Sequence, residues 1–61
     1  MKFSELKKLL KKNGCKMDHP GKAHDIWYSP KTGAYFPVGR HDSQEVAPGT
    51  LSSILKDAGI K

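Results

Sequence analysis

Hydrophobic residues recur at helical spacing near both ends of the chain. In the first of these segments they stand three and four positions apart, at Leu6, Leu9 and Leu10, which puts them on one face of an α-helix. Ser4 is a typical N-cap residue, and Gly14 suits the left-handed position that follows a helix. The pattern predicts a first helix over residues 4–13.

The same spacing returns near the other end, at Leu51, Ile54, Leu55 and Ala58. Thr50 can cap this segment and Gly59 can end it. We therefore expect a second helix over residues 50–58.

The middle of the chain favours short strands. We expect them over residues 15–18, 25–28 and 35–38, with a turn between the last two that contains a proline and a glycine. Pro37 has no amide hydrogen to donate, so the third strand lies at a sheet edge or ends there. Residues 39–49 show no periodic pattern and indicate an exposed polar connector.

Alternation along the second strand sorts its side chains into two sets. His24 is expected at the first position of this strand, on the same face as Ile26 and Tyr28. Asp25 and Trp27 point the other way. Both sets contain an apolar residue, so alternation alone does not show which face is buried.

These elements, in the order helix, three strands, helix, predict an α+β fold. An antiparallel three-stranded sheet with both helices on one face is the arrangement that buries all the apolar faces. A chain of 61 residues has the size of one small domain, so we expect residues 1–61 to form a single domain.

Charge narrows the choice of partner. Eleven Lys and Arg residues against six Asp and Glu residues give a net charge of +5, which favours polyanions. Four lysines lie together on the helix face opposite the leucines: Lys7, Lys8, Lys11 and Lys12. Such a face is often merely solvated, but a polyanion would relieve the repulsion between these charges.

The cysteine content and the hydropathy argue against disulfide-bonded, zinc-binding and membrane-spanning proteins. With one cysteine there is no internal disulfide, and Cys15 with three dispersed histidines gives no zinc-binding spacing, so we expect no metal and no cofactor. Cys15 is interpreted as a small buried residue. No apolar stretch approaches the roughly 20 residues that span a bilayer, and no signal peptide is evident, so a cytoplasmic protein is expected.

His24 is the candidate for chemistry. Histidine takes up and releases protons near neutral pH, which is the work required at the 2′-hydroxyl and the 5′-oxygen of a cleaving RNA linkage. The basic residues expected to contact RNA phosphates are Lys7, Lys8, Lys11, Lys12, Lys16, Lys22 and Arg40. Four aromatic residues can either stack on bases or pack in the core: Trp27, Tyr28, Tyr35 and Phe36.

Several segments together resemble the HicA family of toxins, which are small RNA-cleaving proteins of toxin–antitoxin pairs. The matching features are a lysine-rich first helix ending at Gly14, then His24 with Ile26 and Trp27, then Pro30 and Gly33, then Pro37, Val38 and His41, and finally residues 49–59. Ala23 stands where the family has a serine before the histidine.

This resemblance implies a double-stranded-RNA-binding-domain-like fold of order α-β-β-β-α. It also implies a metal-independent endoribonuclease that cleaves mRNA and arrests translation, with His24 as the catalytic residue. The implied partner is a HicB-type antitoxin that covers the active site. The free toxin would be monomeric, with higher-order assembly in the complex.

Two readings without catalysis stay open. The same charge and aromatic residues would serve a small RNA-binding module, which would tolerate loss of His24. A structural adaptor whose lysines meet only an acidic protein would cleave no RNA.

Overall fold

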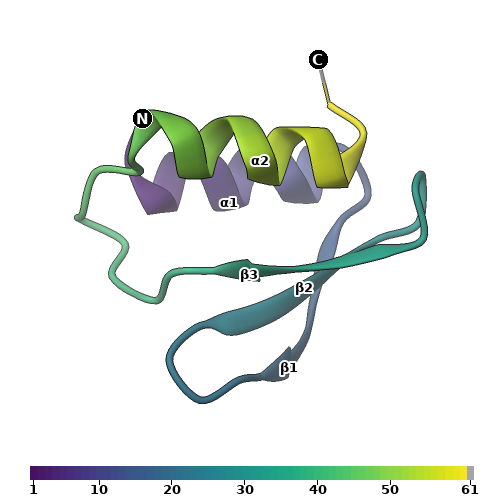
Figure 1. Cartoon of the computed structure of the whole chain (residues 1–61), viewed down its shortest axis with the longest axis horizontal. Coiled ribbons are helices and arrows are strands. Elements are labelled where there is room, and N and C mark those ends of the chain that lie inside the picture. Colours follow the sequence, from purple (N-terminus) through teal and green to yellow (C-terminus); the bar gives the residue numbers. More distant parts are fainter. Residues whose placement is uncertain (61) are drawn as a thin grey trace.

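The computed structural model describes residues 1–60. Its elements are α1 (Phe3–Lys12), β1 (Lys16–Pro20), β2 (Asp25–Ser29), β3 (Ala34–Val38) and α2 (Pro48–Ala58). The strands form one antiparallel sheet in the order β1-β2-β3, and both helices lie on the same side of it (Figure 1). The predicted α+β fold is confirmed, and its element order is compatible with the double-stranded-RNA-binding-domain-like fold.

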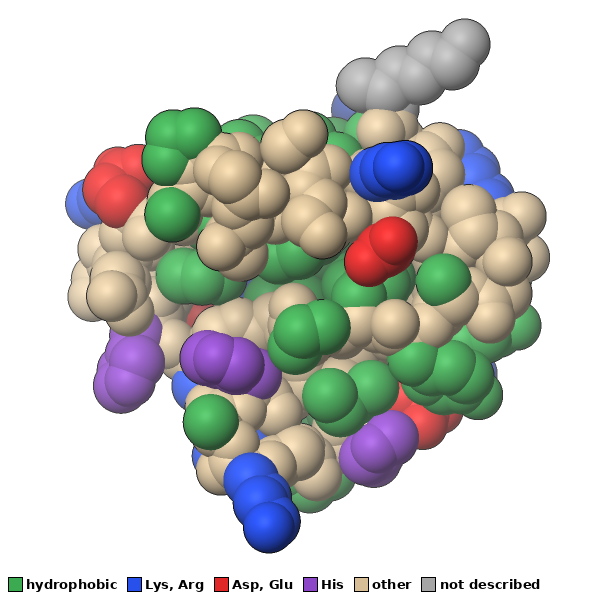
Figure 2. All heavy atoms as spheres, in the orientation of Figure 1, with side chains coloured by type: hydrophobic (Ala, Val, Ile, Leu, Met, Phe, Trp, Pro, Cys, Tyr) green, Lys and Arg blue, Asp and Glu red, His purple; other side chains and the backbone are tan. Residues whose placement is uncertain are grey.

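The connector between β3 and α2 is less exposed than its polar sequence predicts. Val46 is buried in it, with 5% of its surface exposed, and its amide donates to the carbonyl of Met1 over 2.9 Å. Lys2 and Glu45 form an isolated antiparallel bridge. The connector is therefore packed beside the start of α1, and histidine side chains are exposed on the side of the molecule where it runs (Figure 2).

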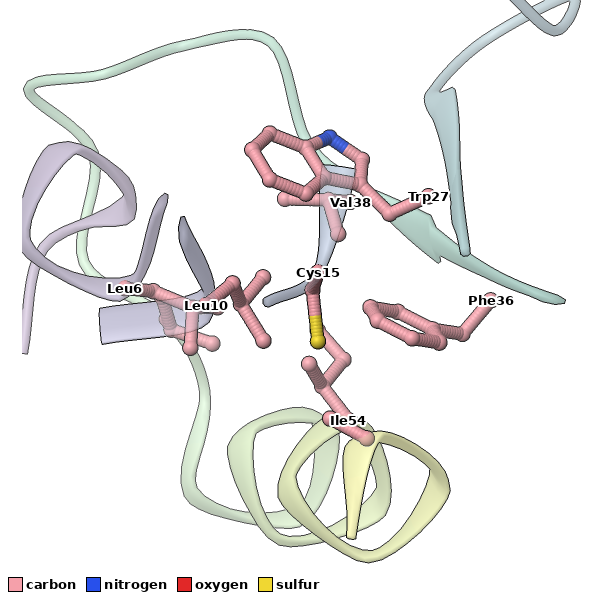
Figure 3. Packing of buried hydrophobic residues seen from close by; sticks show 9 residues of the cluster. Leu6, Leu10, Cys15, Trp27, Phe36, Val38 and Ile54 are labelled. Atoms are coloured by element: carbon pink, nitrogen blue, oxygen red, sulfur yellow. The ribbon is translucent and has the colours of Figure 1, made fainter. Parts of the chain in front are cut away.

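One apolar core joins the helices to the sheet. Its buried members are Leu6, Leu10, Cys15, Trp27, Phe36, Val38, Val46, Ile54 and Ala58. The side chains labelled in Figure 3 converge from both helices, from β2 and β3, and from Cys15, which stands just before β1. Trp27 thus marks the buried face of β2, and Cys15 is a packing residue, as expected.

Both helices begin earlier than the capping residues predicted. α1 begins at Phe3, so Ser4 lies inside it, because connector carbonyls of Gln44 and Asp42 accept the amides of Phe3 and Ser4 over 3.1 Å each. α2 begins at Pro48, whose fixed φ suits a first helical position, so Thr50 lies in its first turn and does not cap it. The expected ends hold: Gly14 and Gly59 follow the helices with φ of 86° and 77°.

The ends of the strands also differ from the predicted ones. β1 runs to Pro20 instead of ending at Asp18, because pairing with β2 continues past an irregularity between Met17 and His19. His24 lies in the loop one residue before β2 and not in the strand. β2 and β3 are each one residue longer than expected, since Ser29 pairs with Ala34.

The β2–β3 hairpin is tied to the end of α2. Ser29, which is fully buried, donates its hydroxyl to the carbonyl of Ala58 over 2.8 Å. Thr32 donates to the carbonyl of Asp57. These hydroxyls satisfy carbonyls that have no partner within the helix.

Candidate active site

A cavity of about 290 Å³ lies at the end of the sheet opposite the hairpin. It is lined by parts of α1, the β1–β2 loop, the connector and α2: Phe3, Ala23, His24, Gly39, His41, Gln44, Glu45, Ala47 and Thr50. Four segments that are distant in the sequence therefore meet around one opening, and two of its side chains are imidazoles.

A tight turn positions His24. The amide of Gly21 donates to the carbonyl of His24 over 2.9 Å and closes the β1–β2 loop. A Cβ atom at Gly21 would lie 2.5 Å from that carbonyl oxygen, so only glycine permits this closure. The backbone of His24 is fixed while its side chain remains exposed.

Arg40 braces the same loop from the connector. Its Nε donates to Oδ1 of Asp25 over 2.9 Å, and its Nη2 donates to the carbonyl of Gly21. Because these bonds join the connector to the residues on both sides of His24, Arg40 holds the two walls of the cavity together.

His41 also lines the cavity, from a part of the connector that is anchored to α1. The next residue, Asp42, accepts a hydrogen bond from Nζ of Lys7 over 2.6 Å, and its carbonyl accepts the amide of Ser4. Glu45 also lines the cavity, and the chain's amino group lies 3.0 Å from its Oε2. Two histidines that are separate in the sequence thus face one cavity.

Sequence reasoning did not pair His41 with His24. The only signal was the family resemblance around Pro37 and Val38, because the connector that carries His41 has no periodic pattern. The third histidine, His19, lies outside the cavity in β1, with its Nδ1 2.6 Å from Oδ2 of Asp18.

The basic residues expected to contact RNA fall into two groups. Lys7 and Arg40 each contact a carboxylate, Asp42 and Asp25 respectively. The others are exposed: Lys8, Lys11, Lys12, Lys16 and Lys22. Among these, Lys22 stands in the same short loop as His24 and is therefore nearest in sequence to the cavity wall.

Within residues 1–60, no three His, Cys, Asp or Glu side chains come together as a possible metal site. The helices in the described part of the chain are too short or too polar to cross a membrane.

Comparison with known families gives a match over nearly the whole chain. The model of a family described as HicA toxin of bacterial toxin–antitoxin systems matches residues 3–60 of the 61-residue chain. The matched range includes both helices, the sheet and every residue that lines the cavity. No curated protein and no solved structure matched significantly.

Proposed function

The chain belongs to the HicA toxin family of bacterial toxin–antitoxin systems, and from this membership and the histidine-lined cavity we propose that it is an endoribonuclease that cleaves mRNA. The observation that carries the proposal is the exposed His24 on a braced loop, facing a cavity that it shares with His41. Membership alone gives a toxin that works with an antitoxin partner; the reaction and its residues are our inference.

The proposed reaction is transfer within the RNA. An imidazole removes the proton of a 2′-hydroxyl, the resulting oxygen attacks the adjacent phosphorus, and the bond from phosphorus to the 5′-oxygen breaks. The leaving oxygen takes a proton from a second donor. The products are a 2′,3′-cyclic phosphate and a 5′-hydroxyl.

We assign one of these proton transfers to His24. His41 lines the same cavity, which supports a second proton-transfer group there. Because RNA supplies its own nucleophile, the reaction requires no metal-bound water.

The basic surface would hold the substrate. Exposed lysines attract the phosphate backbone without reading sequence, and Lys22 would act beside the cavity. A HicB-type antitoxin that covers the cavity would block access of RNA, and its loss in the cytoplasm would lead to arrest of translation.

The ends of the products test the proposal. Purified protein incubated with RNA should give 5′-hydroxyl and cyclic or 3′-phosphate ends, and EDTA should not inhibit. Ends with a 5′-phosphate, or rescue of EDTA-treated protein by magnesium, would indicate a metal-bound water instead. The matched control is the His24→Ala variant, purified in parallel by the same procedure, which should give no product above background.

The same assay separates the proposal from its rivals. A non-catalytic RNA-binding module would bind RNA in a salt-dependent way and give no new ends. An adaptor for an acidic protein would do neither.

A further inference from the structure

The face of the sheet turned away from the helices carries two rows of side chains. Residues paired directly across antiparallel strands share a face, so the register defines both rows. The first row is Lys16, Tyr28 and Tyr35, and the second is His19, Ile26 and Pro37. We call this surface the open face.

The aromatic residues of the sheet divide between its two faces. Trp27 and Phe36 lie in the core, with 3% and 1% of their surface exposed. Tyr35 is 59% exposed on the open face, and its ring lies against Tyr28 with the centroids 4.9 Å apart at 46°. Core packing therefore accounts for the first pair, while Tyr35 presents a ring that the fold leaves uncovered.

We propose that the open face is a platform for single-stranded RNA, with a base stacked on Tyr35 and a phosphate held by Lys16. This inference rests on the proposed function and adds to it a binding site outside the cavity. Stacking on exposed rings tolerates any base, because every base has a flat apolar face.

The charges of the open face favour RNA over a protein. Neither row contains an acidic side chain, and Lys16 stands directly beside Tyr28 in the register. The nearest carboxylate along β1 is that of Asp18, and its Oδ2 lies 2.6 Å from Nδ1 of His19. A cation next to flat rings matches a ligand that offers phosphates and unstacked bases, which single strands provide and duplexes do not.

The open face is continuous with the loop that carries His24. The side chain of Ile26, in the second row, lies 3.4 Å from the position of a Cβ atom at Gly21, whose amide closes that loop. Successive rows on one face of a sheet are about 7 Å apart. A strand of RNA that leaves Tyr35 would therefore pass over Ile26 and reach the loop that carries His24 within a few nucleotides.

The test compares Tyr35→Ala with Tyr35→Phe, which keeps the ring. With an unstructured oligoribonucleotide, Tyr35→Ala should raise KM roughly 5- to 150-fold at unchanged kcat, the range that follows from losing one stacked base. Tyr35→Phe should stay near the parent. Met17→Ala is the matched control, because Met17 is 48% exposed on β1 but is paired with Trp27 and so belongs to neither row.

Binding measured without cleavage completes the test. In the His24→Ala background, a fluorescent 2-aminopurine base in the oligonucleotide should be quenched on binding, and Tyr35→Ala should remove the quenching. Lys16→Gln leaves the rings in place and provides the test if Tyr35→Ala fails to fold. It should reduce the magnitude of the slope of log K against log salt by about 0.7, because one phosphate contact is lost.

The outcomes separate this inference from the proposed function. If the parent cleaves RNA and both Tyr35→Ala and Lys16→Gln match it, the platform is wrong while the nuclease stands. If the parent neither cleaves nor binds RNA, both fail. If the variants bind RNA normally but lose affinity for the antitoxin, the open face is a protein interface and the platform is overturned.

Discussion

The two ends of the sheet use their polar side chains in opposite ways. At the hairpin end, the hydroxyls of Ser29 and Thr32 donate to the last carbonyls of α2. At the loop end, backbone and arginine contacts hold the walls together, and His24 and His41 are exposed around a cavity. Polar groups serve stability at one end and are available for a ligand at the other.

This difference explains how so small a fold can carry a site. A domain of about 60 residues has little core to spare, so a loop with exposed imidazoles needs support from elsewhere. The hairpin end fixes the sheet against α2, and Gly21 and Arg40 then hold the loop without using an imidazole side chain. Variants at the two ends should therefore separate activity from stability.

The largest effect is expected for His24→Ala. Loss of a proton-transfer group lowers the cleavage rate about 10²- to 10⁴-fold, while an exposed side chain changes the free energy of unfolding by no more than about 0.5 kcal/mol. Cleavage assays and thermal melts on the same sample measure both quantities.

His19→Ala is the matched control for that variant. His19 is exposed and lies on the open face, outside the cavity, so its loss should leave the cleavage rate at saturating RNA unchanged. A folded His24→Ala protein that cleaves at the parental rate would remove His24 from the mechanism and direct attention to His41.

The opposite result is expected for Ser29→Ala. Removing the buried hydroxyl leaves the carbonyl of Ala58 without its donor, which should lower the free energy of unfolding by about 1–3 kcal/mol. In a domain of this size each kcal/mol corresponds to about 4–8 °C in Tm. Well below the transition, the cleavage rate should equal that of the parent.

Ser43→Ala serves as the comparison, since Ser43 is exposed in the connector. Its Tm should stay close to the parental value. If Ser29→Ala instead lost activity while keeping its Tm, the separation of the two ends would be wrong.

The smallest effect is expected for two lysines, one at each end of the sheet. Lys22 is exposed in the loop of His24, whereas Nζ of Lys31 lies 3.2 Å from Oδ1 of Asn13 at the hairpin end. Binding to single-stranded RNA is measured with variants that also carry His24→Ala. Lys22→Gln should then reduce the magnitude of the slope of log K against log salt by about 0.7. Lys31→Gln should leave it unchanged, and equal slopes for both variants would mean that RNA does not favour the loop end.

Local patterns were enough to predict the fold. The leucine spacing of α1, the apolar spacing of α2 and the glycines that follow them depend only on neighbours within a few residues. The sheet was predicted from β-favouring segments and a proline-glycine turn. Burial of Trp27 could not be predicted, because alternation gave two apolar faces and only the position of the helices decides between them.

The start of α1 and the second histidine could not be predicted from local patterns, for one shared reason. The amide of Ser4 is satisfied by a carbonyl of Asp42, and His41 reaches the cavity because the same connector folds back onto α1. Both facts depend on a contact between segments about 40 residues apart, which no periodicity in either segment encodes. The assignments of His24 and the basic residues stay predictions until the variants are measured.

The irregular pairing of β1 has a consequence for self-association. A sheet edge with a regular row of amides and carbonyls invites a second copy to add a strand, and aggregation follows. Here one edge is bent between Met17 and His19 and ends at Pro20, and the other contains Pro37. Each edge thus lacks the regular row of amides and carbonyls on which a second copy could add a strand.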